Sequence, residues 1–142
     1  MWINKTFTDL STLELFEIYK LRTEVFVVEQ NCPYQEVDNL DLIATHLFAK
    51  NCENLTAYAR IIPNQDYVQI GRVLVAKEYR GSGLARELML QAVEIASSYD
   101  QPIKIQAQAY LQSFYESLGF IAISDIYLED GIPHLDMQLV CC

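Results

Sequence analysis

Basic residues are scarce in this sequence. Lys and Arg number 10 against 19 Asp and Glu, which gives a formal net charge of −9 at pH 7. Nucleic-acid binding normally depends on a dense Lys/Arg surface that neutralises phosphates. The scarcity therefore argues against a nucleic-acid partner. The negative charge serves solubility, and it also favours encounter with a cationic small molecule or a basic peptide.

Paired cysteines, an export signal and a membrane span are also missing. The four cysteines are Cys32, Cys52, Cys141 and Cys142. They show no Cys-x-x-Cys spacing, and they are too sparse for a secreted disulfide scaffold. Residues 1–5 do not begin a signal peptide, and no run approaches the roughly 18 apolar residues of a membrane span. We expect a reduced, cytoplasmic protein without a metal site or membrane contact.

No linker, repeat or low-complexity segment divides the chain, and 51% of its residues are hydrophobic, so we expect a single domain over residues 1–142. Strands are expected to end at residues 6–9 and to cover 43–49, 55–62, 67–75 and 102–108, before a final hairpin over 120–140. Helices are expected from a capping box at Ser11–Glu14 to just before Asn31, from Leu84 onward, and over 111–118. The order β-α-β-β-β-α-β-α-β-β predicts an α/β (α+β) fold with a mixed, mostly antiparallel central sheet flanked by helices.

The segment 71–86 carries the clearest functional signal. It combines a strand rich in β-branched residues, a turn that contains Gly81 and Gly83, and the first turn of an amphipathic helix. Such a junction directs several free backbone N–H groups at one point, where an anion binds favourably. Arg80 and Arg86 add positive charge, and Ala85 keeps the first helical turn uncluttered. An acidic protein can hold a polyanion in this way, because the helix N-terminus carries about half a positive charge.

Three nucleotide-binding motifs compete for this segment. A Walker loop requires Gly-Lys-Ser/Thr, but Gly83 is followed by Leu84 and Ala85. A dinucleotide fingerprint requires Gly-x-Gly-x-x-Gly after the first strand of a βαβ unit, whereas Arg86 replaces the third glycine here. The remaining pattern is Arg80-x-x-Gly83-x-Ala85. Its alternative interpretation is an ordinary strand-to-helix turn with exposed arginines.

This pattern resembles the pyrophosphate loop of the GCN5-related N-acetyltransferase (GNAT) superfamily. About thirty residues later, Tyr115-x-x-x-Gly119-Phe120 resembles the ending of that superfamily's last helix. Similarity to the ElaA-like branch covers nearly the whole chain, in Leu21-Arg22, residues 25–34 and 38–46, Gly71-Arg72-Val73, Ala107-Gln108 and residues 129–137. The resemblance implies a GNAT-type sheet, acetyl-CoA as the cofactor and acetyl transfer to an amine.

The resemblance also implies roles for individual residues. Tyr115 would be the general acid that serves the departing coenzyme thiolate. The cofactor would contact Val73, Leu74, Val75, Arg80, Gly81, Ser82, Gly83, Leu84, Ala85 and Arg86. Gln108 stands where many members carry an asparagine that helps to hold the cofactor. Its amide is the same group on a longer stem, so the contact is kept, shifted or lost.

The acceptor amine must lose a proton before it attacks, so a base is needed. No motif singles one out among the candidates, which are Glu29, Glu36, Asp38, His46 and His134. We expect the acceptor to enter over the segment 22–41. Five carboxylates there, at Glu24, Glu29, Glu36, Asp38 and Asp41, accompany a single basic residue, Arg22. This count predicts a negative potential that concentrates cationic amines.

Two function hypotheses follow from these residues. The first is an acetyl-CoA-dependent N-acetyltransferase that acts on a primary amine of a small molecule or peptide. The second is a catalytically silent CoA-binding module that serves as a sensor or partner protein. The presence of Tyr115 favours the first. A cofactor-dependent oxidoreductase has less support, and no pattern indicates the oligomeric state.

Overall fold

The computed structural model describes residues 1–140, so the predictions that concern Cys141 and Cys142 lie outside the described residues. The strands are β1 (Trp2–Thr6), β2 (Thr45–Asn51), β3 (Asn54–Pro63), β4 (Val68–Val75), β5 (Ile103–Gln108), β6 (Phe120–Ala122), β7 (Tyr127–Glu129) and β8 (Ile132–Leu139). The helices are α1 (Thr12–Thr23), α2 (Leu84–Ser97) and α3 (Gln112–Glu116). Short helical turns are η1 (Phe7–Asp9), η2 (Glu24–Glu29), η3 (Asn39–Leu42), η4 (Lys77–Tyr79) and η5 (Ala109–Leu111).

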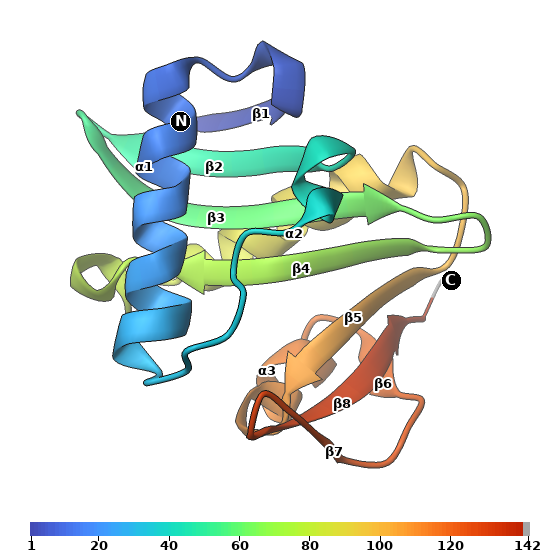
Figure 1. Ribbon diagram of the computed structural model, residues 1–142. Coiled ribbons are helices and arrows are strands. Elements are labelled where there is room, and N and C mark those ends of the chain that lie inside the picture. Colours follow the sequence, from blue (N-terminus) through green and yellow to red (C-terminus); the bar gives the residue numbers. More distant parts are fainter. Residues whose placement is uncertain (141–142) are drawn as a thin grey trace.

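The strands form one sheet in the order β1-β2-β3-β4-β5-β8-β6, and β7 also pairs with β8. Every pairing is antiparallel except that of β4 with β5. Helix α1 covers one face and α2 the other (Figure 1). The predicted mixed, mostly antiparallel sheet flanked by helices is confirmed.

Local signals account for the start of α1. The Ser11 hydroxyl accepts a hydrogen bond from the Glu14 backbone N–H at 3.0 Å, and the Glu14 carboxylate accepts one from the Ser11 N–H at 2.8 Å. This is the predicted capping box, and it satisfies two backbone donors at the helix start. The helix is shorter than expected, because a π-helical turn, η2, follows it before Asn31.

The final hairpin differs from the prediction in one respect. Its turn lies at Asp130-Gly131 as expected, but the first arm divides into β6 and β7, which both pair with β8. Ala122 pairs with Met137 and Tyr127 pairs with His134. Tyr127 is five positions after Ala122, but their partners on β8 are only three positions apart, so the residues between Ala122 and Tyr127 cannot all pair with β8. The Ser124 hydroxyl accepts the Asp136 backbone N–H in this break, which compensates for the lost pairing.

Two apolar cores lie on the two faces of the sheet. Alternate residues of β3 contribute to the two cores: Ala59 and Ile61 pack in the core under α2, and Tyr58 packs in the core under α1. This alternation follows from the pleat, which directs successive side chains to opposite faces. Both faces of β3 are therefore buried, and the strand forms a rigid support for its neighbour β4. No helix within residues 1–140 has the length and apolarity needed to cross a membrane.

Strands β4 and β5 pair over three residues only. Val68 to Ile70 pairs with Ile103 to Ile105, and the strands then part (Figure 1). Beyond that point β4 carries a bulge, since Arg60 of β3 pairs with Gly71 whereas Tyr58 pairs with Leu74. A bulge bends its strand and re-aims the side chains around it. The divergence leaves the last part of β4 without a strand partner on the β5 side.

Candidate active site

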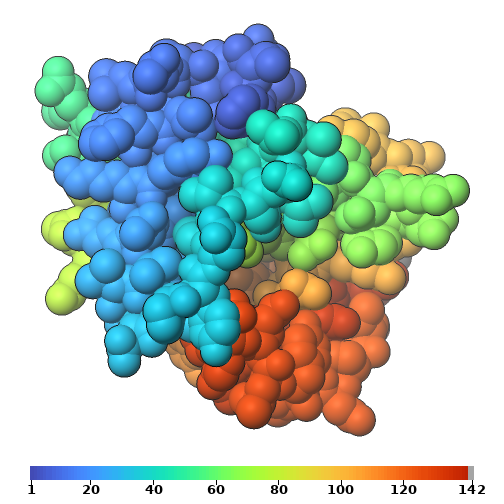
Figure 2. Space-filling model, in the orientation of Figure 1, coloured from blue at the N-terminus to red at the C-terminus, as the bar shows by residue number. Residues whose placement is uncertain are grey.

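A cleft of about 730 Å³ lies where β4 and β5 part. Its walls come from η2 and the loop after it, the ends of β4 and β5, α3, and the turn between β7 and β8. Figure 2 shows its mouth as a hollow between the cyan loop that follows η2 and the orange C-terminal strands. The cleft thus brings together segments from the start, middle and end of the chain.

A second hollow of about 290 Å³ adjoins the cleft at the N-terminus of α2. Gly81 and Gly83 have φ angles of +81° and +83°, and a Cβ added at either would meet no atom within 4 Å. The first N–H of α2 that bonds back is that of Glu87, to the Gly83 carbonyl at 3.3 Å. The preceding N–H groups belong to the free first turn that favours anions. These residues fit a phosphate-bearing ligand.

Most of the predicted cofactor residues lie together. Those that line the large cleft are Val73, Leu74, Val75, Arg80, Ala85 and Gln108. Those that line the second hollow are Val75, Arg80, Gly81, Gly83, Leu84, Ala85 and Arg86. Three of them line both, so the two spaces adjoin each other. Ser82 lines neither, and its hydroxyl donates to the Tyr79 carbonyl at 2.8 Å.

The two arginines of the loop are engaged with protein groups. Arg80 donates to both carboxylate oxygens of Glu29, at 2.6 and 2.9 Å, and to the Val75 carbonyl at 2.9 Å. The guanidinium holds the pKa of Glu29 below its usual range. Arg86 donates to the Ser117 hydroxyl at 2.8 Å and lies over the Phe114 ring. Arg80 therefore connects η2 to the end of β4, and its charge is already compensated.

Tyr115 lies in the cleft wall and is 5% exposed. Its ring packs edge-on against Phe114 and Phe120, at centroid distances of 5.2 and 6.0 Å. Its hydroxyl has no hydrogen bond to another residue within residues 1–140. Burial, with the neighbouring Tyr110, raises the pKa of Tyr115 to about 12. The phenol therefore stays protonated at neutral pH and can donate a hydrogen bond into the cleft.

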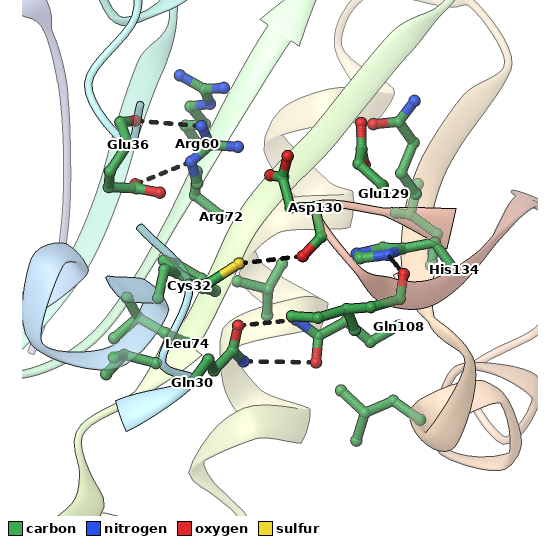
Figure 3. A pocket seen from close by; sticks show the side chains of 18 of the residues that line it. Gln30, Cys32, Glu36, Arg60, Arg72, Leu74, Gln108, Glu129, Asp130 and His134 are labelled. Atoms are coloured by element: carbon green, nitrogen blue, oxygen red, sulfur yellow. Dashed lines mark hydrogen bonds and ion pairs between the residues drawn. The ribbon is translucent and has the colours of Figure 1, made fainter. Parts of the chain in front are cut away.

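Two polar contacts cross the cleft from the loop to the C-terminal strands (Figure 3). The side-chain amides of Gln30 and Gln108 exchange hydrogen bonds at 3.4 and 3.3 Å. The Cys32 thiol donates to the Asp130 carbonyl at 3.2 Å. Gln108 thus uses its longer stem to reach the end of η2, where it meets an amide of the protein itself.

The carboxylates of the loop after η2 are paired with arginines. Arg22, which is 0% exposed, donates to Glu36 at 2.7 Å and to Asp41 at 2.8 Å. Arg60 binds Asp38 at 2.6 Å and 3.1 Å and Asp41 at 3.0 Å. These pairs hold the pKa values of Asp38 and Asp41 below their usual range, against the opposing effect of burial.

Arg72 completes this network from the bulge of β4. Arg72 donates to the Glu36 carboxylate at 2.8 Å (Figure 3). It also contacts Asp38 at 3.5 Å. Its φ of +51° is uncommon for a residue with a side chain, and the bulge accommodates it. The charge count that led us to expect a negative potential over 22–41 was incomplete, because arginines of β3, β4 and the 77–83 turn pair with four of its five carboxylates.

The two histidines have different environments. His46 is buried, and it accepts from the Tyr58 hydroxyl at 2.6 Å and donates to the Asp41 carbonyl at 2.8 Å. Burial lowers its pKa, and it does not line the cleft. His134 does line the cleft. Its Nδ1 lies 2.7 Å from the Ile132 carbonyl, and its ring stacks on Tyr127.

Several residues of the cleft escaped the sequence analysis. They are Gln30, Arg60, Arg72, Glu129 and Asp130. Arg60 and Arg72 carried a signal, because each interrupts an apolar strand, and a buried arginine requires a partner. Gln30, Glu129 and Asp130 fell within the segments similar to the ElaA-like branch, but polar residues are common in loops and turns, so their residue types indicated no role.

A sheet that opens between two strands, with the free N–H groups of a helix start beside the opening, is the arrangement that this chain shares with acyl-CoA N-acyltransferases. A model of the acetyltransferase (GNAT) domain matches residues 11–141. A UPF0039 protein of Schizosaccharomyces pombe is 48% identical, over 97% of this chain and 95% of its own. The ElaA protein of Escherichia coli is 41% identical, over 96% and 94%. The chain therefore belongs to the GNAT acetyltransferase family, in its ElaA-like branch.

Solved structures agree with this membership. An acyl-CoA N-acyltransferase from Pseudomonas aeruginosa is 44% identical, covers 99% of both chains and superposes with a TM-score of 0.94. The crystal structure of E. coli ElaA gives the same coverage and TM-score at 39% identity. Members of this family bind acyl-CoA and transfer its acyl group.

Proposed function

We propose that the protein is an acetyl-CoA-dependent N-acetyltransferase that acts on a primary amine of a small molecule or peptide. One observation carries the proposal. Tyr115, whose hydroxyl is free of protein partners within residues 1–140, lines a cleft that adjoins the hollow at the start of α2. A proton donor thus lies in the wall of a space next to a candidate site for a pyrophosphate.

The residues present fit acetyl-CoA at two points. The free N–H groups at the start of α2, with Gly81 and Gly83, would hold the pyrophosphate. Val73 to Val75, on the part of β4 that lacks a β5 partner, would offer backbone groups to the pantetheine arm. Acetyl-CoA, when bound, supplies an acetyl group activated as a thioester. Family membership supports the acetyl group over a longer acyl chain.

Tyr115 would act chiefly as a hydrogen-bond donor to the departing sulfur. Its pKa of about 12 exceeds the ordinary thiol value of about 8.5 by roughly 3.5 units. Complete proton transfer between the two is therefore uphill by about 5 kcal/mol. A donor that keeps its proton still stabilises negative charge at the moment of bond breaking.

An assay of thiol release from acetyl-CoA tests the proposal. The purified chain is given polyamines, amino acids, aminoglycosides or basic peptides, with butyryl-CoA and hexanoyl-CoA as alternative donors. Amine-dependent thiol release that is fastest with acetyl-CoA supports the proposal. A faster reaction with butyryl-CoA or hexanoyl-CoA would show that the preferred donor carries a longer acyl chain than acetyl. Calorimetric binding of acetyl-CoA without release for any amine would favour a catalytically silent CoA-binding module.

A further inference from the structure

The tautomer of His134 follows from its hydrogen bond. Its Nδ1 lies 2.7 Å from the carbonyl oxygen of Ile132. A carbonyl only accepts, so Nδ1 carries the proton, and Nε2 of the neutral imidazole holds the lone pair. Nε2 has no hydrogen-bond partner within residues 1–140, and it is not enclosed. The stacked Tyr127 ring, at a centroid distance of 6.3 Å, fixes the plane of the imidazole.

His134 and Tyr115 approach the cleft from opposite faces of the sheet. On β8, Leu135 and Met137 belong to the core under α2, so the alternation of the strand directs His134 to the other face. Tyr115 belongs to the core on the α2 side. His134 pairs across the strands with Gln108, which crosses to the loop after α1 (Figure 3). A thioester carbonyl carbon held in the cleft between the two faces of the sheet would have Tyr115 on one side and the His134 imidazole on the other.

The other candidate bases are engaged or distant. Glu29 accepts two hydrogen bonds from Arg80. Glu36 and Asp38 are bound by the arginine network of β3 and β4. His46 is buried outside the cleft with both ring nitrogens bonded. Of the five candidates, His134 is the one that lines the cleft without an ion pair to an arginine.

We infer that His134 is the general base that removes a proton from the acceptor amine, an inference that rests on the proposed acetyl transfer. The acceptor ammonium gives one proton to Nε2. The freed lone pair of the amine then forms the C–N bond as the C–S bond of the thioester breaks. The electron pair of that bond leaves on sulfur, toward the Tyr115 hydroxyl. The amide nitrogen loses its remaining extra proton to water, and the imidazolium returns its own to solvent.

The surroundings of His134 suit this role. Glu129 and Asp130 line the same end of the cleft from β7 and its turn, and neither has an ion pair within residues 1–140. Asp136 follows on β8 and accepts the Tyr127 hydroxyl at 2.6 Å. Gln108 faces His134 from β5, and Cys32 reaches Asp130 from the loop.

A His134→Asn variant separates this role from a structural one. The asparagine amide can place an N–H near the position of Nδ1, so it keeps a donor for the Ile132 carbonyl but has no base. We expect kcat to fall by about 10² to 10⁴. The acetyl-CoA dissociation constant, measured by calorimetry, should stay within about twofold. The acidic limb of the pH profile of kcat/KM should disappear. A His134→Gln variant, which places its amide near Nε2, should be equally slow.

NMR of histidine-labelled wild-type protein tests the geometry without turnover. A neutral His134 protonated on Nδ1 supports the inference, and one protonated on Nε2 would overturn it. If the wild type is active and a folded His134→Asn variant transfers acetyl groups at the same rate, His134 is not the base, and the proposed function still stands. A wild type that releases thiol with no amine would overturn both.

Discussion

At Gly83 the backbone conformation, more than the lack of space, excludes a side chain. Its φ is +83°, and a Cβ there would project into open space at the start of α2. A β-branched residue is strained in this conformation. We expect Gly83→Val to weaken acetyl-CoA binding at least about tenfold while the protein stays folded, because the strain re-orients the free N–H groups. Calorimetry and circular dichroism measure the two effects.

Gly131 offers a matched control for that variant. Its φ of +77° imposes similar strain, and Gly131 itself lines neither the cleft nor the hollow, although its neighbours Asp130 and Ile132 in the β7–β8 turn line the cleft. Gly131→Val should therefore lose similar stability and bind acetyl-CoA as the wild type does. If the wild type, Gly83→Val and Gly131→Val bind acetyl-CoA with equal affinity, the pyrophosphate is not bound at the Gly83 loop.

The Tyr115 hydroxyl can be removed with little change in packing. The ring makes the contacts with Phe114 and Phe120, and the hydroxyl has no protein partner within residues 1–140. We expect Tyr115→Phe to keep acetyl-CoA affinity and to lower kcat by about 10² to 10⁴, because only the donor is lost. Steady-state kinetics and calorimetry check this. Tyr99→Phe, at an exposed site beyond the end of α2, should change neither. Unchanged kcat in Tyr115→Phe would mean that the donor is elsewhere.

At the scale of elements, the loop after η2 is fastened to β3 and β4 by ion pairs. Asp41 is 1% exposed and accepts from Arg22 and Arg60, which are themselves buried. Removing one partner of a buried pair leaves an uncompensated charge, which costs about 3–5 kcal/mol. Asp41→Asn should therefore lower the free energy of unfolding, measured in urea, by about 3 kcal/mol.

A surface pair serves as the comparison. Glu17 accepts from Lys50 at 3.3 Å, and both side chains are partly solvated. Exposed pairs contribute less than about 1 kcal/mol, so Glu17→Gln should have a small effect. Similar losses in Asp41→Asn and Glu17→Gln would show that the arginine network does not fasten the loop.

At the scale of the whole molecule, His46 couples folding to pH. Burial lowers its pKa in the folded protein, and the unfolded chain has the ordinary value of about 6.5. The unfolded state therefore binds more protons below about pH 6.5, so the free energy of unfolding falls as the pH drops. The depressed pKa values of Asp38 and Asp41 act in the same direction, but only below about pH 4.

We expect the free energy of unfolding to decrease by up to about 1 kcal/mol between pH 6.5 and 5.5, because a histidine with an unfolded pKa of about 6.5 goes from about half to about nine-tenths protonated in the unfolded chain over this range. Urea titrations at the two pH values measure it. The decrease in the free energy of unfolding between these pH values should be smaller in His46→Gln than in the wild type. It should remain in His134→Asn. A wild-type stability that is flat over this range would show that His46 does not carry the coupling.

Much of the fold was determined locally and could be predicted from the sequence. The Ser11–Glu14 capping box, the alternation in β3 and β5, and the glycines before α2 all act over a few residues. Such signals depend on backbone geometry and periodicity, which the neighbouring residues set. Most of the elements, their order and the glycine-containing start of α2 could therefore be predicted without a structure, whereas η2 and the division of the final hairpin into β6 and β7 could not.

Tertiary structure alone decided the chemistry of the cleft walls. Arg60 meets Asp38 across 22 positions, Arg72 meets Glu36 across 36, and Gln30 meets Gln108 across 78. These pairings depend on sheet register and on the bulge of β4, which bring distant side chains within bonding distance. A count of charges along 22–41 could not include arginines from other strands. The free Nε2 of His134 likewise depended on where its other nitrogen found a carbonyl, because hydrogen bonding selects the tautomer.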